Sequence, residues 1–264
     1  MKKYLVIGNP IDHSLSPELH NYWIKFNNIN AVYEKKKLND TEIKRYILDI
    51  KNQNISGLNV TVPFKKIIIP YLDELSEDAK KTQSVNTIYL KDQKVIGHNT
   101  DIEGFEKAIK KINYDFSGKK IFILGAGGVV NSLIYASIKM GSSDIFISNR
   151  TKKKAEEIKN TFNDINLIEW GHIPEFDIII NATSLGLKQE DKINLNFTKI
   201  GKNKLFYDVI YNPSVTNFLQ TGKELGNKFE NGKLMFIYQA SLAFKLWHGV
   251  EPTIDRQTIK LLDR

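Results

Sequence analysis

Short apolar runs and amphipathic stretches alternate along the first part of the chain. Three stretches rich in apolar residues have the length of strands: Tyr4–Asn9, Ala31–Glu34 and Leu58–Val62. Between them, apolar residues recur at helical spacing over residues 17–27 and 40–53. The residues expected on the buried side of the second of these helices are Ile43, Ile47, Leu48 and Ile50. Strands and helices that alternate in this order predict an open parallel α/β sheet.

The alternation resumes after one hairpin. The runs Val85–Leu90 and Val95–His98 flank a polar turn, which is typical of two antiparallel strands. Apolar runs then return at Lys120–Leu124, Asp144–Ser148, Phe176–Ile180 and Leu205–Val209. They predict the strands of a second α/β unit, and an apolar helix begins near Met235.

Composition limits the classes of protein that this pattern can represent. The chain has 264 residues, 41% of them hydrophobic, which is enough for one large core or two modest ones. It has no Cys, which excludes disulfides, a thiol nucleophile and Cys-ligated metals. It has neither a long uncharged apolar run nor a signal-peptide pattern, so we expect a cytoplasmic protein without a membrane span.

The charge distribution favours a small ligand over a nucleic acid. The net charge is +8, and the Lys residues are spread along the whole chain. Scattered Lys is typical of solvated surface, and no recognition motif or aromatic–basic platform for nucleic acid accompanies it. The excess of positive charge suits an anionic small molecule, and no cluster of metal-ligating residues is visible.

The stretch from Asn59 to Lys65 concentrates the first candidate chemistry. Asn59 and Thr61 alternate with valines and are expected on one face of a strand. Pro63 ends the strand and suits a first helical position, so Lys65 is expected on the first turn of a helix just beyond the strand. Ligands of open α/β sheets bind at that edge. The alternative is an edge strand followed by a solvated Lys.

Two helix starts carry further polar candidates. Ser16 is expected to cap a helix with Pro17 in its first position, and Ser14 places a second hydroxyl at the same positive helix end. The pair suits a carboxylate, although a plain helix cap explains Ser16 equally. Asp101 precedes a helix that is expected to begin at Ile102, where it is either a plain N-cap or a functional carboxylate.

A glycine-rich turn between a strand and a helix indicates a dinucleotide site. Gly125-Ala126-Gly127-Gly128 follows an apolar strand and precedes a helix from about Val129 to Met140. Such glycines let the backbone approach a pyrophosphate at the helix N-terminus. The pattern is imperfect, because Val130 stands where a third Gly or Ala is usual.

The end of the following strand distinguishes between two cofactors. An NAD site usually places Asp or Glu there, but this chain has Asn149-Arg150-Thr151 followed by three Lys. A cation at this point suits a 2′-phosphate, so the sequence favours NADP.

With these stretches in place, the chain resembles the shikimate dehydrogenases over its full length. The motifs that carry the resemblance are Ser14-Leu15-Ser16-Pro17, Asn59-Val60-Thr61-Val62-Pro63-Phe64-Lys65, Ser84-Val85-Asn86-Thr87, Asn99-Thr100-Asp101, Gly125-Ala126-Gly127-Gly128, Asn149-Arg150-Thr151, Asn181-Ala182-Thr183-Ser184 and Gln239. The resemblance implies NADPH-dependent reduction of 3-dehydroshikimate to shikimate, in aromatic amino-acid biosynthesis.

The resemblance also implies two α/β domains with the active site in the cleft between them. The substrate-binding domain would span residues 1–101 and be rejoined by C-terminal helices at 235–264, and a Rossmann-type NADP-binding domain would span 102–234. The implied partner is a small-molecule substrate, with neither nucleic acid nor membrane, and the implied oligomeric state is a monomer or homodimer.

Roles carry over by position. Lys65 and Asp101 would form the catalytic pair. The substrate would contact Ser14, Ser16, Asn59, Thr61, Lys65, Asn86, Asp101, Tyr211 and Gln239. The cofactor would contact Gly125, Ala126, Gly127, Gly128, Val129, Asn149, Arg150, Thr151, Lys154, Val209 and Gly232. The sequence departs from the family pattern at Ile102, Val129, Val130 and Asn131, which bears on cofactor affinity more than on the reaction.

Two alternatives stay open. A quinate or quinate/shikimate dehydrogenase that uses NAD would share these motifs, although Asn149-Arg150 favours NADP. A non-catalytic ligand sensor on the same fold would not need both Lys65 and Asp101.

Overall fold

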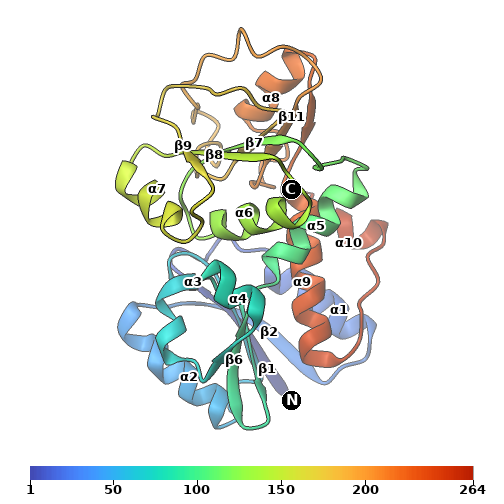
Figure 1. Cartoon of the computed structure of the whole chain (residues 1–264). Coiled ribbons are helices and arrows are strands. Elements are labelled where there is room, and N and C mark those ends of the chain that lie inside the picture. The colour runs from blue at the N-terminus through green and yellow to red at the C-terminus, as the bar shows by residue number, and fades with distance from the viewer. Residues whose placement is uncertain (264) are drawn as a thin grey trace. The chain divides into compact units, whose positions relative to one another are not determined.

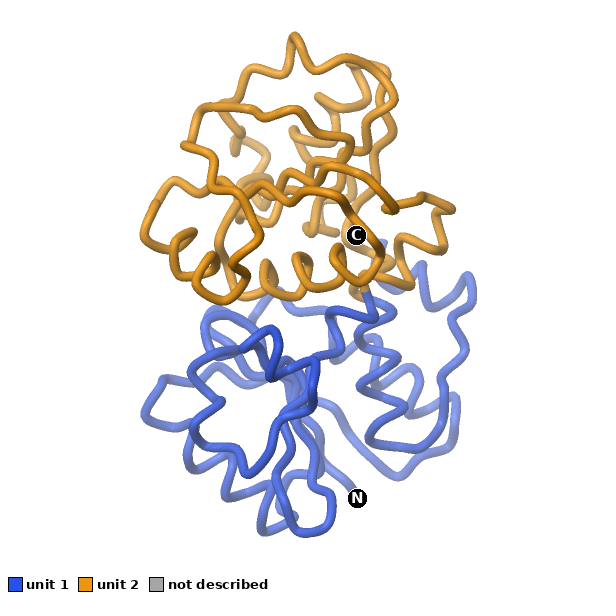
Figure 2. Tube along the Cα trace, viewed as in Figure 1, with its two compact units in different colours: residues 1–104, 237–263 blue, residues 105–236, 264 orange. Residues whose placement is uncertain are grey.

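The computed structural model describes residues 1–263, which form two compact units (Figure 1, Figure 2). Unit 1 comprises residues 1–104 and 237–263, and unit 2 comprises residues 105–236. Each unit has its own sheet, so each is described separately below.

Two helices carry the chain from one unit to the other. The chain leaves unit 1 within α5 (Asp101–Lys111) and returns within α9 (Lys233–His248). The last residue of the predicted C-terminal segment, residue 264, lies outside the described part of the chain. Within residues 1–263, no helix combines the length and the apolar character that a membrane crossing requires.

Unit 1 is built on a six-stranded sheet in the order β2-β1-β3-β5-β6-β4. Its strands are β1 (Lys2–Gly8), β2 (Ala31–Lys37), β3 (Gly57–Val60), β4 (Glu74–Leu75), β5 (Thr87–Lys91) and β6 (Lys94–His98). Its other helical segments are α1 (Ser16–Phe26), η1 (Asp40–Glu42), α2 (Ile43–Lys51), α3 (Phe64–Ile67), η2 (Ile69–Tyr71), α4 (Glu77–Thr82) and α10 (Arg256–Lys260). The predicted parallel arrangement holds for β2, β1 and β3, whereas the β5–β6 hairpin joins β3 in antiparallel orientation.

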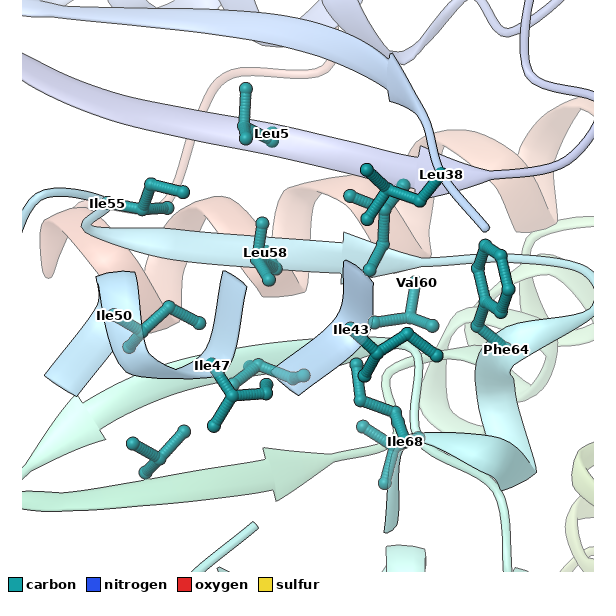
Figure 3. Packing of buried hydrophobic residues seen from close by; sticks show 14 of the residues in the cluster. Leu5, Leu38, Ile43, Ile47, Ile50, Ile55, Leu58, Val60, Phe64 and Ile68 are labelled. Atoms are coloured by element: carbon teal, nitrogen blue, oxygen red, sulfur yellow. The ribbon is translucent and has the colours of Figure 1, made fainter. Parts of the chain in front are cut away.

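A hydrophobic cluster joins α2 to the sheet of unit 1 (Figure 3). Ile43, Ile47 and Ile50 of α2 lie in it together with residues of β3. They follow the i, i+4, i+7 spacing that puts side chains on one helix face. The prediction that Leu48 is buried with them is wrong: it is 49% exposed, because one residue along a helix rotates the side chain by about 100° off that face.

Strand β3 stops two residues before its predicted end at Val62. Val60 is buried but Val62 is 54% exposed, so the two valines do not share one face as the alternation predicts. The cause is a tight turn, in which the Phe64 N–H donates to the Thr61 carbonyl oxygen (2.9 Å). The turn leads directly into α3, and Lys65 lies on its first turn as predicted.

Unit 2 holds a second six-stranded sheet, in the order β12-β11-β10-β7-β8-β9, and its paired strands are all parallel. The strands are β7 (Lys120–Leu124), β8 (Asp144–Ser148), β9 (Asn166–Leu167), β10 (Ile178–Asn181), β11 (Leu205–Asp208) and β12 (Lys228–Glu230). The helices are α6 (Val130–Lys139), α7 (Lys152–Lys159) and α8 (Asn217–Glu224). Buried apolar strands joined by crossover helices confirm the predicted Rossmann-type arrangement.

Helix α9 approaches the first sheet closely at one glycine. A Cβ atom on Gly57 would lie 2.4 Å from Nε1 of Trp247, a residue of α9. That indole nitrogen donates to the Ile88 carbonyl oxygen (3.1 Å), so the ring is fixed against the sheet. The absence of a side chain at Gly57 is therefore what allows α9 to pack here.

We expect Gly57→Ala to lower the free energy of unfolding by about 1–3 kcal/mol, because the added methyl group overlaps the fixed indole. Urea denaturation monitored by circular dichroism measures the change. In a Trp247→Leu background the same substitution should cost much less. An unchanged urea midpoint in the wild-type background would contradict the packing argument.

Candidate active site

A buried ion pair lies at the edge of the first sheet. Lys65 and Asp101 are 8% and 5% exposed, and Nζ of Lys65 lies 2.5 Å from Oδ2 of Asp101. Lys65 comes from the first turn of α3 and Asp101 is the first residue of α5, so two separate turns of chain bring the charges together. A carboxylate in the first turn of a helix is stabilised by the helix dipole.

Helix α5 begins one residue earlier than predicted. The N-cap position belongs to Thr100, whose carbonyl oxygen accepts the Gly104 N–H (3.0 Å). The Asp101 carboxylate accepts from Nδ2 of Asn86 through Oδ1 (2.8 Å) and from Lys65 through Oδ2. The interpretation of Asp101 as the plain N-cap is therefore wrong, and its carboxylate is held by side chains.

Asn86 connects this pair to its surroundings. Its Oδ1 accepts from the Thr100 N–H (2.8 Å), and its Nδ2 donates to Oγ1 of Thr100 (2.9 Å) as well as to Asp101. Oε1 of Gln239 lies 3.4 Å from the same Nδ2. Gln239 reaches this position because α9 crosses α5 at a glycine: a Cβ on Gly104 would lie 2.8 Å from Cβ of Gln239.

Asn59 extends the network into the sheet. Its Nδ2 donates to the Asn86 carbonyl oxygen and to Oγ1 of Thr87, both at 3.0 Å, and its Oδ1 accepts from the Tyr33 hydroxyl (2.7 Å). Asn59, Asn86, Lys65, Asp101 and Gln239 are thus brought together in unit 1. Thr61 follows β3, half-buried, and its N–H donates to the Ile7 carbonyl oxygen (2.9 Å).

Ser14 and Ser16, the two serines predicted to bind a carboxylate, are buried at the start of α1, but their local hydrogen bonds differ from the prediction. Helix α1 begins at Ser16 with Leu15 in the N-cap position, and no side chain caps it. Oγ of Ser14 accepts from the Ser16 N–H (3.3 Å). The prediction that Ser16 caps the helix is wrong. Its side chain is instead hydrogen-bonded to Tyr33.

Tyr33 was not predicted, and it links two predicted site residues. Its hydroxyl bonds to Asn59 and to the Ser16 side chain, and burial raises its pKa well above the usual value, so it remains a neutral donor. Its ring stacks on His20 with centroids 4.1 Å apart. Burial lowers the pKa of His20 to about 3, so the ring stacked on Tyr33 is neutral. No sequence motif identifies Tyr33.

The glycine turn of unit 2 offers bare backbone at a helix start. Gly125 has φ of +111°, and a Cβ there would lie 2.8 Å from the Ala182 carbonyl oxygen. Gly127 and Gly128 are exposed, and the nearest heavy atom to a Cβ on Gly127 would be 3.8 Å away. Ala126, between Gly125 and Gly127, is half-buried. This open turn precedes the ten-residue helix α6 and fits a dinucleotide pyrophosphate.

Helix α6 has Val129 in its N-cap position. Of the other departures from the family pattern, Ile102 and Val130 are fully buried, so they serve the cores.

The predicted phosphate-binding residues lie together after β8. Nδ2 of Asn149 donates to the Thr151 carbonyl oxygen (2.8 Å), and Thr151 is the N-cap residue of α7. Arg150 and Lys154 are exposed. Within residues 1–263, neither cation has a hydrogen-bond or ion-pair partner. Unpaired cations at a helix start are suited to an anion from outside the chain.

Val209 and Gly232 also meet, because a Cβ on Gly232 would lie 2.1 Å from the Val209 carbonyl oxygen. Tyr211 belongs to unit 2, where its ring stacks on Phe236 with centroids 4.5 Å apart. The structure therefore groups the predicted cofactor residues within unit 2. It groups the predicted substrate residues within unit 1, with Tyr211 as the exception.

An α/β unit with a buried Lys–Asp pair and a second α/β unit with an open glycine turn define a two-domain, dinucleotide-dependent oxidoreductase. Comparison with known proteins identifies the family. Residues 6–88 match the shikimate dehydrogenase substrate binding domain, and residues 106–209 match the shikimate / quinate 5-dehydrogenase family.

A protein of Pelagibacter ubique named shikimate dehydrogenase (NADP(+)) is 58% identical over 99% of both chains. The crystal structure of shikimate dehydrogenase from Aquifex aeolicus has a TM-score of 0.89 and 37% identity, and the match covers 99% of this chain and 97% of that one. The enzyme of Thermus thermophilus in complex with NADP(H) and shikimate has a TM-score of 0.89 and 27% identity, with coverage of 99% and 98%. The chain belongs to the shikimate dehydrogenase family, which confirms the resemblance seen in its motifs.

We expect Tyr33→Phe to lower the free energy of unfolding by about 1–3 kcal/mol, because it leaves Oδ1 of Asn59 without its buried donor. Thermal or urea unfolding measures the loss. Tyr22→Phe is the matched control: its hydroxyl makes one exposed bond to Gln257 (3.2 Å), so the cost should stay within about 0.5 kcal/mol. Equal losses for the two variants would contradict the assigned network.

Proposed function

We propose that this protein catalyses the reversible, NADP-dependent reduction of 3-dehydroshikimate to shikimate, a step of aromatic amino-acid biosynthesis. The observation that carries the proposal is the buried Lys65–Asp101 ion pair, which lies in the unit that belongs to the family's substrate-binding domain. The protein is an oxidoreductase with a small-molecule substrate, and we infer that it acts in the cytoplasm as a monomer or homodimer.

Lys65 provides the proton that the reaction requires. NADPH, when bound, supplies the hydride that reduces the ketone carbon. The Lys65 ammonium has three N–H donors, of which one points to Asp101, so others remain for the ketone oxygen. Asp101 orients the amine and balances its charge, and in the oxidative direction neutral Lys65 receives the hydroxyl proton.

The substrate is recognised mainly by neutral hydrogen-bonding groups around this pair, together with the Asp101 carboxylate. Ser14 and Ser16 bind the carboxylate with their hydroxyls, at the N-terminus of α1. The ring hydroxyls are held by Asn59, Thr61, Asn86, Asp101 and Gln239, and Tyr211 completes the substrate contacts. Amides and carboxylates provide both the donors and the acceptors that vicinal hydroxyl groups need.

The cofactor is held by four separate segments of unit 2. Backbone N–H groups of Gly125, Ala126, Gly127, Gly128 and Val129 bind the pyrophosphate. Asn149, Arg150, Thr151 and Lys154 surround the 2′-phosphate, and Val209 and Gly232 contact the nicotinamide. The unpaired Arg150 and Lys154 support NADP over NAD, because NAD has no phosphate to pair with them.

We expect Lys65→Ala to lower kcat by about 10²–10⁴-fold with little change in KM, because ground-state binding rests on the neutral groups. Shikimate oxidation with NADP, followed at the nicotinamide absorbance, measures both constants. Lys66→Ala is the matched control, because Lys66 is the exposed neighbour on α3 and should retain normal kcat.

Asp101→Ala should also lower kcat, and the effects of the two substitutions in the Lys65→Ala/Asp101→Ala double variant should be far from additive. Near-normal kcat in folded Lys65→Ala would refute the assignment.

Arg150→Ala tests the cofactor assignment. We expect NADP binding to weaken by about 1.5–3 kcal/mol, because one charge-assisted contact to the 2′-phosphate is lost, while NAD binding hardly changes. Isothermal titration calorimetry with each cofactor measures the effect. Arg45→Ala, an exposed Arg of α2 in unit 1, should leave both affinities unchanged. Equal losses for NADP and NAD in Arg150→Ala would contradict the phosphate contact.

A further inference from the structure

Asp208 is a fully buried carboxylate to which the proposed reaction assigns no role. It is the last residue of β11 and has 0% exposure. Oδ1 accepts from the Ile210 N–H (3.0 Å), Oδ2 accepts from the Thr216 hydroxyl (2.6 Å), and Nδ2 of Asn181 lies 3.1 Å from both oxygens. No Lys, Arg or His within residues 1–263 forms an ion pair with it.

A buried charge without a counter-ion is costly, so its position in the fold is informative. Leu124 of β7, Asn181 of β10 and Asp208 of β11 are paired in register across three neighbouring parallel strands. They mark the carboxyl edge of the sheet, where ligands of open α/β sheets bind. The chain continues from this row into the glycine turn, residues 182–186 and residues 209–216.

Asn181 connects Asp208 to the glycine turn through hydrogen bonds. Its Oδ1 accepts from the Thr183 N–H (3.1 Å), and its Nδ2 donates to the Leu185 carbonyl oxygen (3.0 Å), which shapes residues 182–186. The Ala182 carbonyl oxygen within this turn is the atom that a Cβ on Gly125 would meet at 2.8 Å. The glycine turn therefore rests on backbone that Asn181 holds.

Asp208 itself fixes residues 209–216 at two points. It binds the Ile210 N–H near one end and the Thr216 hydroxyl at the other. Val209 lies between Asp208 and Ile210 in the chain. Its N–H donates to the Asn181 carbonyl oxygen (3.0 Å), and its carbonyl oxygen lies against Gly232.

We propose that Asp208 is a positioning residue for cofactor binding, which acts through Asn181, Ile210 and Thr216 to set the loops at the carboxyl edge of the second sheet. The proposal rests on the proposed function. All the groups around the carboxylate donate hydrogen bonds, so only an ionised acceptor satisfies them together. Burial raises the pKa of Asp208 to about 6, so the group is ionised at neutral pH.

The test is direct binding of NADP+ to the full-length protein by isothermal titration calorimetry at pH 8. Asp208→Asn turns an NH2 group toward existing donors, and we expect the Kd for NADP+ to rise about tenfold or more. The KM for shikimate at saturating NADP+ should change much less than the Kd for NADP+, because all the proposed substrate contacts except Tyr211 lie in unit 1. A folded Asp208→Asn protein with an unchanged Kd would overturn the proposal.

A second pair of variants covers the case in which Asp208→Asn does not fold. Thr216→Val removes one donor to the carboxylate and should raise the Kd for NADP+ several-fold, whereas Thr216→Ser keeps the hydroxyl and should bind like wild type. Thr216 also accepts the Leu219 N–H (3.3 Å) as the N-cap residue of α8, so the thermal midpoint should fall in Thr216→Val. A lower midpoint with an unchanged Kd would mean that the network only stabilises the fold, and would overturn the proposal.

Asn227→Ala is the matched control. Asn227 is buried at the opposite edge of the same sheet, where it accepts from the Lys204 N–H (2.9 Å) just before β11. It should lower the thermal midpoint without changing the Kd for NADP+, and a comparable loss of affinity would contradict a role specific to Asp208. Wild type that binds NADP+ but does not oxidise shikimate would refute the proposed function alone. Wild type that does not bind NADP+ would refute both.

Discussion

The burial of the Lys65–Asp101 ion pair is the constraint on which the first unit depends. Taking two charges out of water costs several kcal/mol for each ion, and their attraction repays this only when the geometry is good and further hydrogen bonds are present. Both conditions are met: the charged atoms are 2.5 Å apart, and the second carboxylate oxygen accepts from Asn86. A hydrophobic pair would fill the same space with less cost, so the charges are explained by chemistry more readily than by stability.

The hydrogen bonds around that ion pair continue into the rest of unit 1 through amide side chains. The Asn86 side chain donates to Asp101 and accepts from the Thr100 N–H. The Asn86 carbonyl oxygen accepts from the Asn59 side chain, which in turn accepts from the Tyr33 hydroxyl. Residues distant in sequence are thereby tied to one location. The buried carboxylate of unit 2 is stabilised differently, because Asp208 is surrounded by neutral donors and has no paired cation among residues 1–263. In the proposed reaction the first arrangement would keep a proton donor beside the substrate, whereas in the proposed positioning role the second would provide a fixed acceptor that orders three loops.

The sequence predicts those parts of the fold and site that depend on local pattern. The strand, glycine turn and helix around Gly125 follow directly from residue types, since a φ of +111° beside a close backbone contact admits glycine almost alone. The placement of Lys65 just after β3 follows from the strand and the proline. The sequence does not predict what depends on tertiary partners. The end of β3 is set by the Thr61 turn, Ser16 bonds to Tyr33 instead of capping α1, and Leu48 faces outward although it is apolar.

The density of the network also determines which substitutions report on function. Nδ2 of Asn86 has two hydrogens and lies within reach of acceptors on Thr100, Asp101 and Gln239, so removal of this amide deprives several buried groups of their partner at once. Any loss of activity would then combine lost binding with displaced catalytic groups. Lys65 differs, because within residues 1–263 its Nζ bonds to Asp101 alone, and its neighbour Lys66 provides a control on the same helix. Arg150 differs as well, because it is exposed and its removal leaves no group within residues 1–263 without a partner. Lys65→Ala leaves the buried Asp101 carboxylate without its cation, so its activity is read beside its free energy of unfolding. The exposed Arg150 therefore separates cofactor choice from folding more cleanly than Lys65 or Asn86 separates catalysis from folding.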